Sequence, residues 1–216
     1  MGFTEKEAKL LSQTLFVSSS AFGLFSFGIG ISMLYVNTTL ALIVLIYGSL
    51  SLLGITCLPF AGEKLACVWS FAGCAGYYAG TFCYSHGLNT TDIIFLVLAT
   101  VFVGIAASVA AYLSREMMAV YALTAGIASM LYIPMSIYYL FNGGDKLFLL
   151  LVSVAFIISV IVFMVDSQKV MKEIQRGQPD VWVLGIIIFQ DLFDLFLQLA
   201  KLLIALKSTD RKKKND

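Results

Sequence analysis

The sequence predicts an all-α polytopic membrane protein of seven helices, the last of them central and wrapped by the other six. Of the 216 residues, 60% are apolar and 12% are charged, and the mean hydropathy is +0.92. An ordinary soluble domain has about 25% charged residues, and so short a chain cannot bury this much apolar surface inside a globule. A soluble domain, a disordered chain and a nucleic-acid-binding protein are therefore excluded, and the bilayer is the expected partner.

Seven apolar runs of membrane-spanning length predict the seven helices. A run of about 20 residues crosses the hydrocarbon as a helix and is too long for a strand of a barrel. The predicted segments are 11–35, 40–60, 64–84, 92–113, 117–141, 146–166 and 181–206.

Stretches of polar and turn-forming residues separate these runs and support each boundary in turn. Asn, Thr, Pro and Gly often interrupt helices. The connections are 37–39, 59–64, 85–91, 114–116, 142–146 and, as the one long polar connection, 167–180. Residues 1–206 are therefore predicted to form a single transmembrane domain, and residues 207–216 a basic C-terminal tail.

Small residues recur at helical spacing in the third, fourth and fifth runs. Such residues let the backbones of membrane helices approach closely. We interpret them as packing seams. They are the stretch 72–80 in the third run, Gly104, Ala106, Ala107 and Ala110 in the fourth, and Ala122, Ala125 and Gly126 in the fifth.

The informative charges lie near the C-terminal end of the chain. The stretch 10–62 contains no Asp, Glu, Lys, Arg or His, whereas Asp166 closes the sixth run and Asp191 and Asp194 lie inside the seventh. A charge in the hydrocarbon costs about 2.5–3.5 kcal/mol on insertion scales, so intramembrane acids indicate a functional site. Three acids near one hairpin are hard to explain as noise.

The last two runs are predicted to form an antiparallel hairpin. The sixth helix is expected to continue to about Arg176 and to reverse through Gly177-Gln178-Pro179, which contains the two strongest helix breakers. Asp166 and Asp191 are equidistant from the centre of that turn. We therefore expect the two carboxylates to face each other at the same depth.

A polar stripe follows on the seventh helix. Asp191, Asp194, Gln198 and Lys201 are spaced by three, four and three residues, which places them on one helix face. Such a face must point into protein or water rather than lipid. Together with Asp166, these side chains are the predicted gate and ion pathway.

Two facing carboxylates in a low-dielectric site cannot both ionise cheaply, so they titrate in coupled steps. With both deprotonated, Asp166 and Asp191, joined by Asp194, would form a hard-oxygen site suited to Ca²⁺. With one shared proton, the pair becomes a closed latch. The prediction is a pH-sensitive cation path gated by Asp166 and Asp191, and the alternative is a static hydrogen-bonded pair that fixes the hairpin.

Three stretches of this hairpin resemble the signature of the Bax inhibitor family, the transmembrane Bax-inhibitor-motif proteins. They read Val-Asp-Ser-Gln at 165–168, Gly-Gln-Pro-Asp-Val-Trp at 177–182, and Phe-Gln-Asp-Leu-Phe-Asp-Leu-Phe at 189–196. The family pattern has Asp-Thr-Gln at the end of the sixth helix and Leu-Phe-Leu-Asp-Phe, followed by a polar residue, in the seventh. The basic tail looks like that of the eukaryotic, endoplasmic-reticulum branch.

The resemblance implies a seven-helix fold with the last helix wrapped by the others, a Ca²⁺ leak regulated by cytosolic pH, and suppression of cell death. Cell-death regulators of the Bcl-2 type are the protein partners that it suggests. The family's paired aspartates fall on Asp166 and Asp191, and the polar positions that follow fall on Asp194, Gln198 and Lys201.

The sequence also departs from the family pattern. Bacterial relatives carry a basic latch residue near the cytosolic end of the second helix, where this chain reads Cys-Leu-Pro-Phe-Ala-Gly at 57–62. Lys64 is the nearest cation. An acidic residue expected in the second helix is missing as well, so the partner of the aspartate latch is open.

Two other functions are compatible with these residues. One is a non-transporting membrane interaction protein that regulates apoptosis, in which the acids are purely structural. The other is a proton-coupled cation exchanger. No residue suggests catalysis, so neither an enzyme nor a cofactor is predicted, and Ca²⁺ is expected as the permeant ion.

The C-terminus predicts the membrane in which the protein resides. Lys213 and Lys214 have the form of a dilysine retrieval signal, which is read from the cytosol, so the endoplasmic reticulum is predicted, with a bacterial inner membrane as the alternative. The distribution of Lys and Arg favours a cytosolic N-terminus. Seven full crossings cannot place both ends in the cytosol, so either the tail signal is accidental or the last segment does not fully cross.

Overall fold

The fold is known from a computed structural model, which describes residues 4–142, 144–177 and 179–213. Seven long α-helices and one short 3₁₀-helix account for nearly all of these residues, so the predicted all-α class is confirmed. The elements are α1 (Glu5–Leu34), α2 (Thr38–Cys57), α3 (Ala61–Ser85), α4 (Thr90–Leu113), η1 (Arg115–Met117), α5 (Met118–Asn142), α6 (Asp145–Arg176) and α7 (Val181–Lys213).

Several helices begin before their apolar runs, at polar residues that cap the helix N-terminus. Helix α1 begins six residues before the predicted run because Thr4 and Glu7 form a capping box, in which the Glu7 amide donates to Thr4 Oγ1 at 3.4 Å. Asn37 accepts from the Leu40 amide at the start of α2. Asn89 and Asp92 accept from each other's amides, both at 2.9 Å, at the start of α4.

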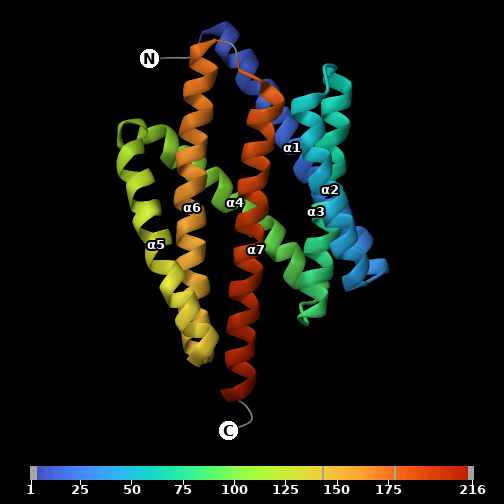
Figure 1. Ribbon diagram of the computed structural model, residues 1–216, viewed down its shortest axis with the longest axis vertical. Helices are drawn as coiled ribbons and strands as arrows, with labels where there is room; N and C mark the ends of the chain where they lie inside the picture. The colour runs from blue at the N-terminus through green and yellow to red at the C-terminus, as the bar shows by residue number, and fades with distance from the viewer. Residues whose placement is uncertain (1–3, 143, 178, 214–216) are drawn as a thin grey trace. The chain divides into compact units, whose positions relative to one another are not determined.

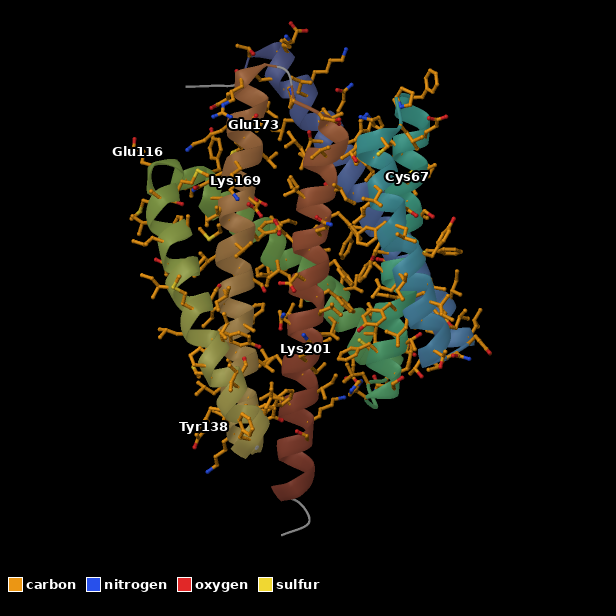
Figure 2. The ribbon with its side chains drawn as sticks, viewed as in Figure 1. Cys67, Glu116, Tyr138, Lys169, Glu173 and Lys201 are labelled. Carbon is orange, nitrogen blue, oxygen red and sulfur yellow. The ribbon has the colours of Figure 1, made fainter. Side chains whose placement is uncertain are left out.

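The predicted hairpin between the sixth and seventh helices is confirmed. Helix α6 extends to Arg176, and its polar end carries Lys169 and Glu173 (Figure 2). The chain reverses at Gly177, whose φ of +92° favours glycine. Helix α7 then continues to Lys213, seven residues past the predicted end of the last run. Lys and Arg are good helix formers, and cations are favourable at a helix C-terminus.

Six of the helices are long and apolar enough to span a membrane within the described residues, namely α1, α2, α4, α5, α6 and α7. The protein is therefore an integral membrane protein. Helix α3 is not among the six, although a spanning segment was predicted at 64–84. Small and hydroxylated residues lower the hydropathy of α3. The small ones serve close packing, since Ala72, Ala75, Gly76, Ala79 and Gly80 are all buried.

The chain divides into two compact units, Met1–Ile93 with Lys169–Gln190, and Ile94–Gln168 with Asp191–Asp216. In the first, α1, α2 and α3 lie side by side (Figure 1). In the second, α5 and α6 run side by side and are joined at Gly144, where the rings of Tyr139 and Phe148 are 5.6 Å apart (Figure 1). The single domain 1–206 stays a prediction, because α4, α6 and α7 each contribute to both units.

Helix α7 contacts four of the other helices. Phe189 packs against Phe25 of α1 and Phe71 of α3 in the first unit. In the second, Leu192 lies against Gly104 of α4, and Asp194 accepts a hydrogen bond from α6. Within each unit, α7 therefore has at least two helix neighbours, and its central position with the other six helices wrapped around it stays a prediction.

The packing seam predicted on α5 is wrong: within the described residues, most of this face packs against no other helix. Only 6% of the span of α5 is buried, and a Cβ built on Gly126 would meet nothing within 4 Å. Ala122 is exposed, and of the predicted seam only Ala125 is buried. Small residues permit close approach but do not by themselves bring a neighbouring helix.

Candidate functional site

All five predicted pathway residues lie in the second unit. Asp166 is on α6, and the other four, Asp191, Asp194, Gln198 and Lys201, are on α7. Each is half-buried, and Figure 2 shows Lys201 on α7. Val165, Leu195 and Phe196, which flank the acids along the chain, are buried. The polar side chains are therefore set among apolar ones, within helices of spanning length.

Asp194 is the acid whose partners are best defined. Ser159 of α6 donates a hydrogen bond from Oγ to Asp194 Oδ2, and Gln198 Nε2 donates to Asp194 Oδ1 at 3.3 Å. The carboxylate thus accepts at both oxygens, once across the hairpin and once along its own helix. Ser159 was not predicted from the sequence. A serine in an apolar run can donate to its own helix or to a neighbouring one, and the sequence does not distinguish the two.

The contact between Ser159 and Asp194 also measures the register of the hairpin. From this contact, Asp166 is seven residues nearer to the Gly177 turn and Asp191 is three residues nearer. At about 1.5 Å per residue, these steps are about 10 Å and about 5 Å, so the two aspartates differ in depth by about one helical turn. The sequence predicted equal depth, and direct pairing of Asp166 with Asp191 stays a prediction.

Asp191 has one carboxylate oxygen shielded from solvent. Its Oδ2 atom is buried, and the next residue, Leu192, lies so close to α4 that a Cβ on Gly104 would be 2.6 Å from Leu192 Cδ2. The absence of a side chain at Gly104 therefore lets α4 approach α7 beside the acid. This contact confirms part of the seam predicted in the fourth run.

The predicted Ca²⁺ site of Asp166, Asp191 and Asp194 is not formed. Within the described residues, no group of three His, Cys, Asp or Glu side chains is placed to hold a metal ion. The physical reason is the register of the hairpin, which spreads the three acids over about 10 Å of depth, whereas one Ca²⁺ ion takes its ligands at about 2.3–2.6 Å. Lys201 lies one turn beyond Gln198, and in the described part of the chain no ion pair joins it to Asp194.

Gln168 is a second polar residue whose role the sequence did not predict. It is 2% exposed, and its Nε2 donates to the carbonyl oxygens of Ala111 at 3.0 Å and Ser114 at 3.1 Å. The last carbonyls of a helix have no partner within that helix. Gln168 of α6 thus caps the C-terminal end of α4, two residues after Asp166.

Replacing Gln168 with leucine should loosen the end of α4. Leaving two carbonyls without their donor costs about 1–3 kcal/mol, and amide hydrogens of 112–118 should exchange faster. Hydrogen exchange in detergent micelles measures this directly. Gln175→Leu, on the exposed side of the same helix, is the matched control and should leave exchange at 112–118 unchanged. Equal exchange in the two variants would contradict the capping role.

Lys64 does not supply the missing latch to the intramembrane acids. It lies in the first turn of α3 and pairs with Asp180, with 2.8 Å between Nζ and Oδ2. Asp180 also caps α7, because Oδ1 accepts from the amides of Trp182 at 3.0 Å and Val183 at 3.4 Å. This ion pair joins the start of α3 to the start of α7 within the first unit. The basic partner of the intramembrane aspartates is therefore unassigned.

The pKa of Asp180 lies below its usual value. Partial burial raises it, but the hydrogen bonds from Lys64 and from the amides of Trp182 and Val183, with the charge of Lys64, outweigh burial. Because the pKa is lower in the folded state, this group stabilises the fold above its unfolded pKa of about 3.9, and that stabilisation is lost as pH falls through the folded value.

Stability should therefore fall more steeply below about pH 4 in the wild type than in Asp180→Asn. The side chain of Asp180 is 42% exposed, so solvent screening limits the difference to at most about 1 kcal/mol. Thermal unfolding in detergent as a function of pH tests this. Lys64→Gln should flatten the curve in the same way, and identical slopes in all three proteins would show that the pair contributes nothing.

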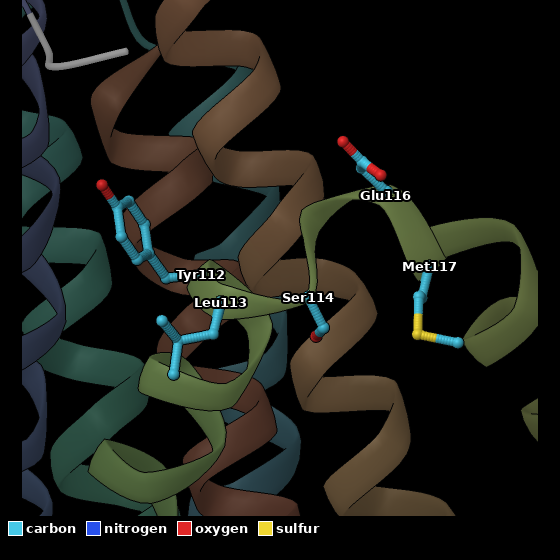
Figure 3. A pocket seen from close by; sticks show the side chains of 5 residues that line it. All are labelled: Tyr112, Leu113, Ser114, Glu116 and Met117. Carbon is cyan, nitrogen blue, oxygen red and sulfur yellow. The ribbon is translucent and has the colours of Figure 1, made fainter.

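A hollow of about 450 Å³ lies at the connection between α4 and α5 (Figure 3). In that view, Tyr112 and Leu113 lie on one side of Ser114, and Glu116 and Met117 on the other (Figure 3). No predicted pathway residue lines it. The predicted targeting residues cannot be placed: Lys214 lies outside the described residues, as does the side chain of Lys213.

The spanning helices and the half-buried acids define a polytopic α-helical membrane protein with a polar C-terminal hairpin. No protein-family model matches the chain, and no curated protein matches it significantly. The resemblance to the Bax inhibitor family therefore stays a prediction, carried by the hairpin residues alone.

Proposed function

We propose that this protein is a pH-sensitive Ca²⁺ leak channel of an intracellular membrane, gated by Asp166 and Asp191. One observation carries the proposal: two half-buried carboxylates lie about one turn apart in depth, in the spanning parts of α6 and α7. Acids at such positions are costly, and they mark ion and proton pathways in membrane proteins.

The chemistry of the pair suits a leak. When both carboxylates are ionised they offer hard oxygen ligands to Ca²⁺, and uptake of one proton by the pair halves the negative charge that attracts the cation. Conduction requires binding that is weak enough for release. Two carboxylates meet this need better than a closed cage of three, so Ca²⁺ is the permeant ion rather than a resident one.

The membrane and the biological role follow from the resemblance. Membership of the Bax inhibitor family would place the protein in the endoplasmic reticulum, as a suppressor of cell death that meets regulators of the Bcl-2 type. The Lys213-Lys214 sequence supports retrieval to that compartment. A bacterial inner membrane is the alternative location.

A non-transporting interaction protein is the second candidate, and the bonds of Asp194 favour it. Both oxygens of this acid accept hydrogen bonds from Ser159 and Gln198, as a purely structural residue would. In that case the hairpin acids hold helices together and conduct nothing.

Reconstitution into liposomes that contain a Ca²⁺-sensitive dye separates these functions. A leak channel should admit Ca²⁺ faster than protein-free liposomes with equal pH on both sides. A proton-coupled exchanger should need a proton gradient, and an interaction protein should give no flux under either condition. The absence of flux above the protein-free control would contradict the proposal.

A further inference from the structure

Ser159 bonds differently from Ser153, which lies six residues earlier in the same helix. Ser153 donates back to the carbonyl oxygen of Leu149, four residues earlier, at 2.8 Å. This local bond is the usual one for a serine inside a helix. Ser159, which is 9% exposed, instead donates across the hairpin to Asp194 Oδ2.

The bond fixes one point of the register between α6 and α7. Asp194 cannot turn freely toward another donor, because Gln198 Nε2 donates to its other oxygen at 3.3 Å. The Ser159 hydroxyl and the Asp194 carboxylate are therefore held at one depth. Asp166 and Asp191 lie seven and three residues from this point on the same two helices, so their separation depends on it.

We propose that Ser159 is a positioning residue whose hydrogen bond to Asp194 sets the separation of Asp166 and Asp191. Asp194 and Gln198 then act as the fixed end of the hairpin, while Asp166 and Asp191 form the part that gates. Only the effect of that separation on gating rests on the proposed function. The register itself can be measured without any Ca²⁺ flux.

Cross-linking measures the register directly. In the full chain with Cys57, Cys67, Cys74 and Cys83 replaced by alanine, Asp166→Cys and Asp191→Cys provide the pair, and a short bifunctional thiol reagent joins them. Adding Ser159→Ala should slow cross-linking about fivefold, the factor that one net hydrogen bond corresponds to. Ser159→Thr keeps the hydroxyl and should restore the rate, and Ser153→Ala is the matched control and should not change it.

The outcomes separate this inference from the proposed function. An equal rate with and without Ser159→Ala, or no cross-link in the parent pair, overturns the positioning role. Slowing by Ser159→Ala that threonine does not rescue also overturns it, because the effect would then be general loosening of the fold. Wild-type protein that gives no Ca²⁺ flux overturns the proposed function, while slowed and rescued cross-linking still supports the role of Ser159.

Discussion

Gly76→Ala should destabilise the protein by about 3 kcal/mol, the upper end of the usual cost of overpacking. A Cβ at position 76 would lie 2.0 Å from the carbonyl oxygen of Phe25 and 2.7 Å from its carbonyl carbon. These are backbone atoms of α1, so no rotamer change relieves the clash. The helices would have to move apart, and dispersion contacts, which drive helix association in a bilayer, would be lost along the seam.

The same close approach recurs on both sides of this position. A Cβ on Gly28 would lie 2.3 Å from the Gly73 carbonyl oxygen, and one on Gly80 would lie 2.0 Å from Ser32 Oγ. Gly73→Ala is the matched control, because a Cβ there would meet nothing within 4 Å. Alanine is also the better helix former. Thermal unfolding in detergent should give a wild-type midpoint for Gly73→Ala and a much lower one for Gly76→Ala; similar midpoints would contradict the seam.

Phe189→Ala should produce the second large loss of stability. Phe189 of α7 is fully buried and packs edge-on against Phe25 at 6.0 Å and Phe71 at 5.9 Å between ring centroids. In soluble proteins the loss of such a ring costs about 3–5 kcal/mol. Here we expect a destabilisation of about 2–3 kcal/mol. In a bilayer the ring leaves the core for lipid rather than for water, so little transfer free energy is lost and mainly the cost of the cavity remains.

Thermal unfolding again provides the measurement, with Phe102→Ala as the control. Phe102 of α4 is 74% exposed, so its ring lies against no core and its loss should change the midpoint little. Equal effects of the two substitutions would show that α1, α3 and α7 do not share an aromatic core. Phe189→Leu should fall between wild type and alanine because it refills part of the cavity.

Much of the fold was predictable because membrane-spanning helices can be identified in a sequence as apolar runs of about 20 residues. The end of α6 and the start of α7 could be found because Gly177 and Pro179, two strong helix breakers, lie between them. The predicted starts were least accurate where polar residues belong to the helix. Thr4 and Glu7 extend α1 before its apolar run, for example, through a capping box.

The site was harder to predict because it depends on how helices are rotated against one another. The spacing of Asp191, Asp194, Gln198 and Lys201 defines one helix face from the sequence alone. Nothing in the sequence selects Ser159, rather than a more distant acid, as the partner of Asp194. The register of the hairpin, and with it the depth of Asp166 relative to Asp191, depends on such cross-helix bonds rather than on symmetry about the turn.

Ca²⁺ flux into liposomes between about pH 6 and pH 8, where a coupled carboxylate pair can change charge, tests the central claim most directly. Wild-type flux should rise with pH as the pair loses a proton and becomes more negative, and Asp191→Asn should abolish that dependence. Asp180→Asn, outside the spanning part of α7, should keep it. An unchanged pH response in Asp191→Asn would contradict a gate formed by Asp166 and Asp191.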